Sequence, residues 1–559
     1  MYEKESAAYP LIVQSDKTLL LDVHAERAEQ ARSAIIPFAE LEKSPEHIHT
    51  YRITPLSLWN AASVGFTPAD IEKALTEYSR YEVPSGIIEG FSDTMSRYGK
   101  IVIAASDGSD ELLFLADDPV ILAEIGALKS LKKYLTKTDK GFTLQLTDRG
   151  TVKRELIRHG WPVKDEAPLV SGESLDISLR SESGSGRPFS PRDYQIEAAR
   201  SVLGDGRPGT GYGVVSLPCG SGKTIVGMLI MSMLKTNTLI LTTNVAAVHQ
   251  WIDELLDKTG LSRDQIAEYS GDSKSVAPVT VATYQILTWR ASKEGEFLHF
   301  RLFRERQWGL VIYDEVHLLP APVFRVTAEL QAVRRLGLTA TLVREDGAED
   351  AVFSLVGPKR YDVPWKDLEN KGWIAEALCK EIRLDLPEKL KIPYAVATSR
   401  EKYRIASENP LKENIVMQLV ENRSNDQILV IGQYISQLNS LAKVLGAPLI
   451  TGKTPNAERE RIYEAFRRGE ARVIVVSKVA NFAIDLPDAS MAVQVSGSFG
   501  SRQEEAQRLG RILRPKKRNA WFFTLVSRYT VEEDFAANRQ KFLAEQGYKY
   551  SIQHWDIEE

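Results

Sequence analysis

Short apolar runs alternate with longer stretches of helical periodicity in the part of the chain that follows residue 188. Runs rich in β-branched residues, separated mostly by helical patterns, are typical of the parallel sheet of an α/β domain. The first series reads GYGVVSL, TLILTT, VTVATY, GLVIYD and RLGLTAT. A second series starts near Gln427 and reads QILVI, PLIT, RVIVVS, MAVQVS and AWFFTLV. The pattern predicts two tandem α/β domains with parallel sheets, over residues 188–366 and 367–559.

The residues before this part show a mixed pattern, which predicts an α+β region. PLIVQSDKTLLLDVH, residues 10–24, predicts two strands around a turn at Ser15, Asp16 and Lys17. TPADIEKALTEYSRY predicts a helix capped by Thr67. KIVIAA and ELLFLAD, on either side of SDGSD, predict a hairpin, and DRGTVKRELIRHGWPV predicts a short basic helix.

Two segments fit neither pattern. SGESLDISLRSESGSG, residues 171–186, is rich in Ser and Gly and nearly free of large apolar residues, so we expect a flexible tether within a linker over 166–187. Residues 388–425, between the two series of strands, are polar and carry Pro393 and Pro410. We interpret them as an insertion that belongs to neither sheet.

Composition narrows the class of protein. With 559 residues the chain is too long for one core, while 43% hydrophobic and 26% charged residues are ordinary for a globular protein. The two cysteines, Cys219 and Cys379, exclude a disulfide framework or a Cys-rich zinc module, and they fit a reducing, cytoplasmic environment. We expect no signal peptide and no membrane span. The net charge of −4 excludes a globally basic surface but not a local basic groove.

A phosphate-binding loop follows the first predicted strand of the first α/β domain. LPCGSGKT, residues 217–224, lies between that strand and a predicted helix, which is the context such a loop requires, although Leu217 stands where the strict pattern has Gly. Gly220 and Gly222 allow backbone amides to turn toward phosphate oxygens. Lys223 would contact the β- and γ-phosphates, and Thr224 would offer its hydroxyl to Mg²⁺. The remaining loop residues expected to line the nucleotide are Pro218, Cys219 and Ser221.

An acid pair ends another predicted strand, in VIYDEVHLLP (residues 311–320). Two chemistries compete here: a zinc site and an acid pair that holds magnesium and a water against a nucleotide. A catalytic zinc site needs three protein ligands, whereas this segment offers one His. With a phosphate loop upstream, we expect Asp314 to bind Mg²⁺ through its hydration shell and Glu315 to orient and deprotonate the attacking water. For His317, contact with the γ-phosphate side, a link to the next motif and an interdomain hydrogen bond all stay open.

The Asp-Glu-Val-His sequence after a Lys-Thr phosphate loop resembles superfamily-two helicases, whose other motifs follow in order. In that family the Gln of SPRDYQIEA, here Gln195, reads adenine. TTNVAAVHQW resembles motif Ia and VATYQ motif Ic, which implies DNA contacts around Thr243, His249 and Thr283. LTATLVRED contains motif III, with Thr339 and Thr341, which couples the ATP site to DNA in the family.

Motifs V and VI lie in the second α/β domain. QRLGRILRP resembles motif VI, so Gln507 is expected at the nucleotide, and Arg511 and Arg514 are expected to act as arginine fingers that reach the γ-phosphate when the domains close. SKVANFAIDLP resembles motif V; it retains Asp485 but carries Ala480 and Phe482 at two places where the family has small and polar residues.

Arg344, Glu345 and Asp346, directly after motif III, resemble the RED motif of the XPB helicases, the TFIIH ATPase and its prokaryotic relatives. In that family the triplet lies near the point where strands separate. The resemblance implies an N-terminal XPB-type region at 1–99, a damage-recognition-like domain at 100–165, two RecA-like helicase domains at 188–366 and 367–559, and a thumb-like insertion at 388–425. The size of the chain is similar to that of bacterial or archaeal members.

The resemblance implies an ATP- and Mg²⁺-dependent 3′–5′ DNA helicase that acts in nucleotide-excision repair, with a repair nuclease as a possible partner. Two alternatives stay open: a duplex translocase or strand-annealing ATPase that unwinds weakly, and a DNA-binding scaffold switched by ATP. RNA is the remaining alternative substrate. We expect a monomer in the cytoplasm, because one chain carries both halves of the ATP site.

Overall fold

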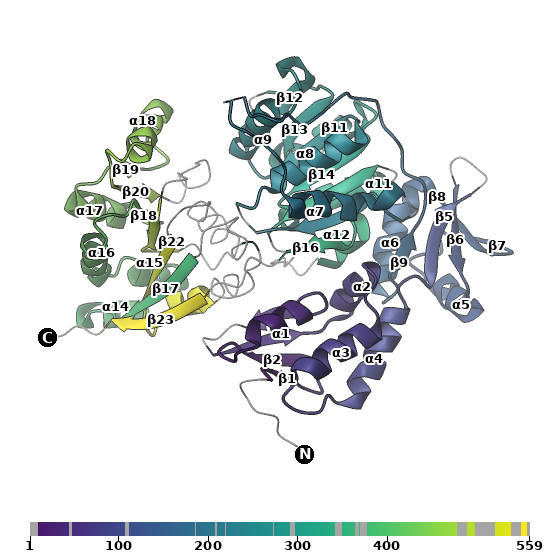
Figure 1. Cartoon of the computed structure of the whole chain (residues 1–559), viewed down its shortest axis with the longest axis horizontal. Coiled ribbons are helices and arrows are strands. Elements are labelled where there is room, and N and C mark those ends of the chain that lie inside the picture. The colour runs from purple at the N-terminus through teal and green to yellow at the C-terminus, as the bar shows by residue number, and fades with distance from the viewer. Residues whose placement is uncertain are drawn as a thin grey trace.

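The structure, a computed structural model, contains four sheets in chain order (Figure 1). It describes residues 9–43, 47–106, 111–184, 186–206, 209–218, 220–271, 273–290, 297–331, 333–340, 349–363, 368, 377–477, 489–497, 520–537 and 549–555. Two small sheets precede two seven-stranded parallel sheets. The predicted class, tandem RecA-like α/β domains after a mixed α+β region, is confirmed.

The first unit is an antiparallel sheet in the order β1-β2-β4-β3 with four helices. The predicted hairpin is present, since β1 pairs antiparallel with β2 and Lys17 takes the left-handed conformation at the turn. The predicted helix is α3, where Thr67 and Asp70 form a reciprocal capping box. The bounds are β1 Leu11–Val13, β2 Thr18–Asp22, α1 Ala28–Ile35, β3 Glu40–Lys43, β4 Ile48–Arg52, α2 Pro55–Ser63, α3 Pro68–Tyr78 and α4 Ser85–Ser96.

The second unit is a five-stranded sheet in the order β7-β8-β6-β5-β9. The predicted hairpin is β5 with β6, and the predicted basic helix is α6. Strand β9 adds parallel to β5 at the edge of the sheet. The bounds are β5 Ile101–Ala105, β6 Glu111–Ala116, α5 Pro119–Ala127, β7 Thr136–Thr138, β8 Gly141–Gln145, η1 Leu146–Asp148, α6 Arg149–Arg158 and β9 Val163–Asp165.

The third sheet has the order β12-β13-β11-β14-β15-β10-β16, with every strand pair parallel. All five predicted strands of this part are present, and β12 and β16 extend the sheet at its edges. The strand bounds are β10 Tyr212–Ser216, β11 Thr238–Thr242, β12 Ile266–Tyr269, β13 Val279–Thr283, β14 Leu310–Asp314, β15 Arg334–Thr339 and β16 Lys359–Asp362.

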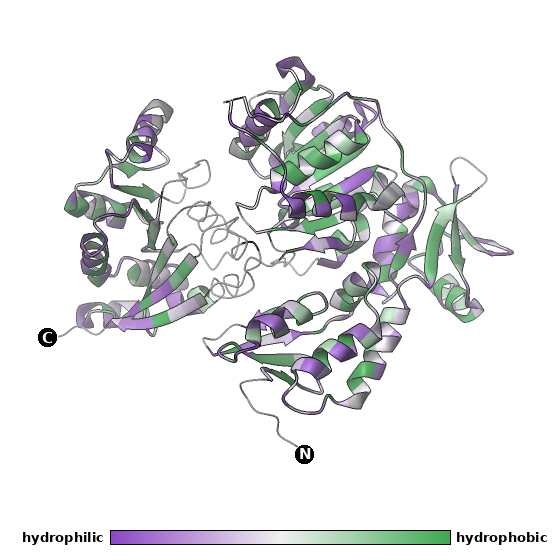
Figure 2. Cartoon of the chain, in the orientation of Figure 1, coloured by the Kyte–Doolittle hydropathy of each residue, from purple (hydrophilic) through white to green (hydrophobic). Residues whose placement is uncertain are grey.

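Helices cover this third sheet, so its central strands are buried on both faces, as expected for a parallel sheet. Helix α8 is itself buried from Ile225 to Met231, and Figure 2 shows it mainly in the hydrophobic colour. The bounds are α7 Asp193–Leu203, η2 Gly204–Gly206, α8 Lys223–Leu234, α9 Val245–Lys258, η3 Arg263–Gln265, α10 Tyr284–Thr288, η4 Leu298–Arg304, η5 Val316–Leu318, α11 Ala321–Glu329 and α12 Glu349–Leu355.

The fourth sheet is also parallel, in the order β19-β20-β18-β21-β22-β17-β23. Its five predicted strands are present, whereas β17 and β23 were not predicted. The bounds are β17 Ala377–Leu384, α14 Glu388–Val396, α15 Ser399–Ser407, α16 Leu411–Glu421, β18 Ile428–Gly432, α17 Ile435–Leu445, β19 Leu449–Ile450, α18 Asn456–Arg467, β20 Val473–Ser477, β21 Met491–Gln494, β22 Ala520–Ser527 and β23 Lys549–Trp555. None of the helices described here or above is long and apolar enough to span a bilayer.

The interpretation of residues 388–425 as an insertion that packs on neither sheet is wrong for most of the segment. Ile415 and Val416 of α16 are fully buried in the core of the fourth sheet. Lys412 is buried as well and pairs with Glu532 at 2.8 Å. The polar composition of this segment does not indicate exposure, because some of its polar side chains, such as Lys412, are buried and paired inside the domain. Helix α14 alone keeps large apolar side chains exposed, at Ile392 and Val396.

The expectation of a flexible tether at residues 171–186 is also wrong. Residues 171–182, which we call the strap, run along the third-sheet domain and form backbone hydrogen bonds with it at several places. The Leu175 N–H donates to the Lys235 carbonyl, and the Arg180 N–H donates to the Lys258 carbonyl, both at 2.9 Å. Leu175 and Ile177 enter the domain core. The small Ser and Gly residues thus allow the strap backbone to approach the domain closely, and they do not make this segment flexible.

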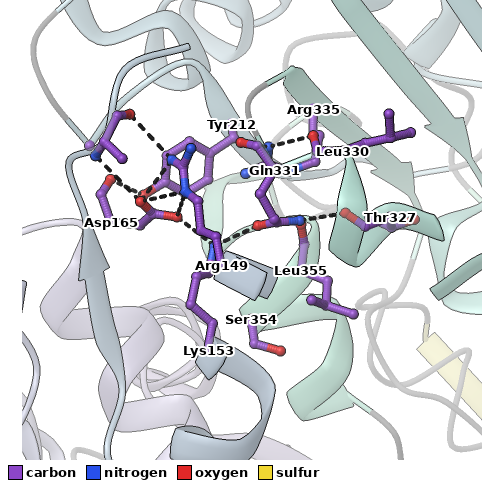
Figure 3. A network of polar contacts seen from close by, with 12 residues as sticks. Arg149, Lys153, Asp165, Tyr212, Thr327, Leu330, Gln331, Arg335, Ser354 and Leu355 are labelled. Carbon is purple, nitrogen blue, oxygen red and sulfur yellow. Dashed lines mark hydrogen bonds and ion pairs between the residues drawn. The ribbon is translucent and has the colours of Figure 1, made fainter. Parts of the chain in front are cut away.

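A buried cluster of charges joins the second unit to the third sheet (Figure 3). The carboxylate of Asp165, on β9, accepts hydrogen bonds from Arg149 and Lys153 of α6. Lys153 also donates to the Gln331 amide oxygen at 2.7 Å, and the Tyr212 hydroxyl donates to the Asp165 backbone carbonyl at the same distance. Because these side chains are buried and span both bodies, the second unit is docked on the third-sheet domain.

Candidate active site

The predicted phosphate loop connects β10 to α8. Gly220 and Gly222 have φ of 77° and 83°, a left-handed conformation that glycine adopts without steric cost. Gly222 is the residue directly before α8, and Lys223 begins the helix. Pro218 and Ser221 lie in the loop, and Thr224 lies in the first turn of α8, whereas Cys219 lies outside the described residues. The loop therefore ends at a helix N-terminus, where backbone N–H groups favour an anion.

Helix α7 supports this loop from one side. The Gln195 side-chain amide donates to the Ser221 carbonyl at 2.9 Å, and the Tyr194 hydroxyl donates to the same oxygen. A Cβ at Gly222 would lie 2.5 Å from the Gln195 Nε2 atom. The left-handed φ of Gly222, together with this close approach, favours glycine between the loop and α7. The adenine-reading role of Gln195 stays a prediction.

Strand order brings the loop and the acid pair to one edge of the sheet. Strands β14, β15 and β10 are neighbours, and their carboxyl ends meet at the same edge. In the register, Asp314 lies opposite Leu338, and Thr339 lies opposite Ser216. Functional residues of open α/β sheets gather at such carboxyl ends.

Lys223 and Glu315 face each other across this edge. Lys223 Nζ lies 3.5 Å from Glu315 Oε1, and both side chains are only slightly exposed. Glu315 has φ of 50°, an uncommon value for a residue with a side chain, because the chain turns sharply from β14 into η5. The turn places the second carboxylate beside the lysine rather than in line with the strand.

Asp314 is held at three of its oxygen atoms. Its Oδ2 accepts from the Trp251 indole N–H at 2.8 Å, and its Oδ1 accepts from the Glu315 N–H at 3.1 Å. Its backbone carbonyl accepts from the Tyr284 hydroxyl at 2.9 Å. Burial, helped by the neighbouring Glu315 carboxylate, raises the pKa of Asp314 to about 6. A cation at this carboxylate would offset the cost of burying its charge.

His317 connects the acid pair to motif III. Its Nδ1 atom lies 2.8 Å from Thr339 Oγ1 and 3.5 Å from Glu315 Oε2. Thr339 is fully buried at the end of β15. Among the interpretations left open for His317, this contact supports the link to the next motif, and it connects the acid pair directly to β15.

Of the predicted DNA-contact residues, Thr243 directly follows β11, His249 lies in α9 and Thr283 is the last residue of β13. The Thr243 hydroxyl accepts from Asn244, the residue that caps α9. His249 is exposed, and its Nε2 lies 3.0 Å from Glu268 Oε2. Thr283 is buried and uses its hydroxyl to cap α10. A role in DNA contact remains a prediction for all three.

Several predicted site residues lie outside the described part of the chain. They are Thr341, Arg344, Glu345, Asp346, Asp485, Gln507, Arg511 and Arg514. Their proposed roles therefore stay predictions.

The donor set at this edge suits a cation shared with phosphate oxygens. Magnesium needs only one or two carboxylates when phosphates and water supply the other ligands. Asp314 and the Thr224 hydroxyl, with a phosphate loop beside them, fit that requirement. No group of three or more His, Cys, Asp or Glu in the described ranges has the arrangement of a metal centre made by side chains alone.

Sequence reasoning missed three aromatic residues that shape the site, namely Tyr194, Trp251 and Tyr284. Each is buried, so each resembles an ordinary core residue in the hydrophobic pattern. Their position in the sequence could have indicated a role in the site, because all three lie inside helicase-like motifs: SPRDYQIEA, TTNVAAVHQW and VATYQ. Aromatic residues with a polar tip find a hydrogen-bond partner when buried, and here the partners belong to the site.

Comparison with known proteins gave three family matches. Residues 368–557 match the family described as ERCC3/RAD25/XPB C-terminal helicase. Residues 188–344 match Type III restriction enzyme, res subunit, and residues 11–139 match Helicase conserved C-terminal domain. The last match covers the first unit and part of the second, whose sheets are not parallel RecA-like sheets.

Curated relatives match almost the whole chain. A protein named DNA 3′-5′ helicase XPB from Kineococcus radiotolerans is 52% identical, over 97% of this chain and 96% of its own length. Its namesake from Mycobacterium tuberculosis is 51% identical, over 98% of both chains. The general transcription and DNA repair factor IIH helicase/translocase subunit XPB of Enterocytozoon bieneusi is 32% identical, over 98% of this chain and 93% of its own.

Proposed function

The chain belongs to the XPB family of DNA 3′–5′ helicases and is an ATP-dependent DNA helicase. From this premise we propose that the site formed by the phosphate loop and the acid pair hydrolyses ATP, and that hydrolysis drives movement along DNA. One observation carries the assignment. Lys223 and Glu315, from two different motifs, lie 3.5 Å apart between the loop and the acid pair. A phosphoryl-transfer site needs a cation for the phosphates and a carboxylate for the water in this proximity.

Each residue then has a distinct task. Lys223 holds the β- and γ-phosphates of ATP, and the amides of the glycine loop hold phosphate oxygens. Glu315 orients the attacking water and takes up its proton. Asp314 and Thr224 would hold Mg²⁺, which supplies charge stabilisation to the transferring phosphoryl group. Arg511 and Arg514, from the second RecA-like domain, complete the charge on the γ-phosphate in a closed state.

His317 and Thr339 connect hydrolysis to the DNA. Their hydrogen bond joins the turn that holds Glu315 to the end of β15, directly before Thr341 and the triplet Arg344–Asp346. A change in the position of Glu315 can therefore be transmitted to motif III. We assign strand separation to the triplet and a role in DNA repair to the protein.

Turnover of ATP measured side by side with single-stranded, forked and duplex DNA tests the proposal. We expect each DNA to stimulate hydrolysis, with the fork giving the highest rate. Stimulation by duplex alone would favour a duplex translocase. Single-stranded RNA is added as a fourth substrate, and stimulation by RNA in place of DNA would favour an RNA motor. Tight DNA binding without turnover would leave only a scaffold switched by ATP.

A forked-duplex unwinding assay tests the wedge. We expect a variant with Ala at Arg344, Glu345 and Asp346 to keep DNA-stimulated hydrolysis and to lose unwinding. Equal unwinding by this variant and the wild type would remove the wedge role and leave the ATPase intact.

A further inference from the structure

Trp251 lies behind the acid pair, on the side of α9 that faces the sheet. Its indole N–H donates to Oδ2 of Asp314 at 2.8 Å, although the two residues are 63 positions apart. We propose that Trp251 is a positioning residue of the ATP site, which fixes the orientation of the Asp314 carboxylate toward the cation bound with ATP. This inference rests on the proposed function, because it assumes that Asp314 holds the cation.

The hydrogen bonds to Asp314 define which lone pairs remain. An ionised carboxylate offers about four acceptor positions. Trp251 uses one on Oδ2, and the Glu315 N–H uses one on Oδ1. Two donors on different oxygens lock the rotation of the carboxylate and leave a free acceptor position on each oxygen. The Tyr284 hydroxyl holds the backbone of the same residue. A carboxylate fixed in this way needs no reorganisation when it meets a cation or its water.

The same indole touches the helix of the phosphate loop. A Cβ at Gly227 of α8 would lie 2.7 Å from the Trp251 Cη2 atom, so only glycine leaves room for the ring at this place. Gly227 lies one turn after Lys223, the first residue of α8. Glycine inside a helix costs about 1 kcal/mol relative to alanine. The close approach of the ring explains why the helix carries a glycine there.

Trp251 therefore bridges the two halves of the site. Its ring packs on α8, which carries Lys223, and its N–H holds Asp314, which ends β14. A tryptophan that only fills the core would need its ring for packing, but it would not need a hydrogen bond to the Asp314 carboxylate. Trp308 gives the comparison: it is equally buried, but its indole N–H donates to the Leu302 backbone carbonyl at 3.0 Å rather than to a carboxylate of the site.

Binding of a non-hydrolysable ATP analogue to the full chain, with Mg²⁺ or with EDTA, tests the proposal. Trp251→Phe keeps an aromatic ring and removes the donor. We expect its analogue affinity in EDTA to equal that of the wild type, and its affinity gain from Mg²⁺ to fall about tenfold, as expected for a lost hydrogen bond to a charged group. Electron paramagnetic resonance with Mn²⁺ in place of Mg²⁺ reports the metal directly and should show the same loss. Trp308→Phe should change neither readout.

An isosteric replacement covers the case in which Trp251→Phe does not fold. Benzothienyl-alanine at position 251 keeps the shape of the indole and replaces its N–H by sulfur, so it should reproduce the loss of Mg²⁺-dependent affinity. If either folded variant gains as much affinity from Mg²⁺ as the wild type, Trp251 is a core residue only. If the wild type itself binds the analogue equally in Mg²⁺ and EDTA, the proposed ATP site fails and this inference falls with it.

Discussion

At the scale of single residues, we expect substitutions of Lys223 and Glu315 to have different effects on nucleotide affinity and on hydrolysis. Lys223→Ala removes the cation for the phosphates, so we expect both nucleotide affinity and hydrolysis to be lost. Glu315→Gln keeps the shape of the side chain and removes the base, so nucleotide affinity should stay within a few-fold while turnover falls by about 10²-fold or more. Equilibrium binding and single-turnover hydrolysis separate the two effects.

The control for this pair is Glu305→Gln, a carboxylate that pairs with Arg301 on the surface of the same domain. It should leave binding and turnover unchanged. An equal loss of nucleotide affinity in Lys223→Ala and Glu315→Gln would contradict the separate roles.

The residues that the sequence singled out and that the structure brings to one edge of the sheet share one property: they depart from the local pattern. Two carboxylates at the end of an apolar strand, or a lysine after two glycines, have no reason to be there in an ordinary fold. The sequence does not single out Trp251 as a site residue, because a tryptophan on the inner face of a helix fits the hydrophobic periodicity of that helix. Its role depends on a hydrogen bond to a residue 63 positions away, and hydrophobic periodicity carries no information about such a partner.

At the scale of elements, Gly172 in the strap and Gly186, four residues after its end, form a matched pair of glycines. Gly172 has φ of 73°, and a Cβ there would lie 2.3 Å from the backbone nitrogen of Gly309. Gly186 has φ of 75°, and a Cβ there would meet nothing within 4 Å. Gly186→Ala should thus cost about 1 kcal/mol, from the positive φ alone. Gly172→Ala should cost about 2 kcal/mol more, because backbone atoms overlap.

Limited proteolysis checks this difference, because cleavage of a segment that opens reversibly follows the population of its open form. A further 2 kcal/mol corresponds to about thirtyfold faster cleavage within the strap for Gly172→Ala than for Gly186→Ala. Equal cleavage of the two variants would mean that the strap is not held by its contact with Gly309.

Elements were predicted well where the pattern was strong and poorly where tertiary contact decides. Five strands of each parallel sheet, β10, β11 and β13–β15 in one and β18–β22 in the other, follow from apolar runs rich in β-branched residues. Strand β17, by contrast, carries Lys380, Glu381 and Arg383, so its sequence does not look like a buried strand. Glu381 is nevertheless buried and pairs with Arg383. The strap and α16 were misjudged for the same reason, since their polar groups find partners that composition does not reveal.

At the scale of the whole molecule, a motor that grips the DNA backbone should bind DNA with a steep salt dependence, although the net charge of the chain is −4. DNA contacts of a translocating motor go mainly to phosphates, whose neutralisation releases counterions. We expect the dissociation constant for a forked duplex to rise about tenfold or more between 50 and 200 mM salt. Fluorescence anisotropy with forks of scrambled sequence should give nearly equal affinities. A flat salt dependence, or a strong preference for one sequence, would contradict a motor that grips the backbone.

The buried charge cluster between the second unit and the third sheet predicts a pH dependence of stability. Lys153 of α6 faces Asp165 of β9, Arg149 of its own helix, and Tyr212 and Arg335 of the third sheet. Burial, reinforced by the two arginines and only partly offset by Asp165, lowers the pKa of Lys153 to about 7. In the unfolded chain the amine has its ordinary value near 10.5.

The sign follows from the protons bound in each state. Between pH 7 and 10.5 the unfolded chain binds the proton of Lys153 more fully than the folded chain does, so the free energy of unfolding rises with pH in this window. The largest slope that one group contributes is about 1.4 kcal/mol per pH unit. Lys153→Met keeps an unbranched apolar stem and removes the titrating group, so the slope should be smaller in this variant. Thermal unfolding midpoints of both proteins at pH 7, 8 and 9 measure the difference.

The exposed Lys132→Met, in the same unit, is the control, and it should follow the wild type at each pH. Parallel pH profiles for the wild type and Lys153→Met would show that the buried amine keeps its proton through its bond to Asp165. A reduced slope in Lys153→Met alone would tie the pH dependence to the contact between the second unit and the ATP-binding domain. Mild alkali would then strengthen the docking of a unit that lies next to β10 and β15, two of the strands that end at the active site.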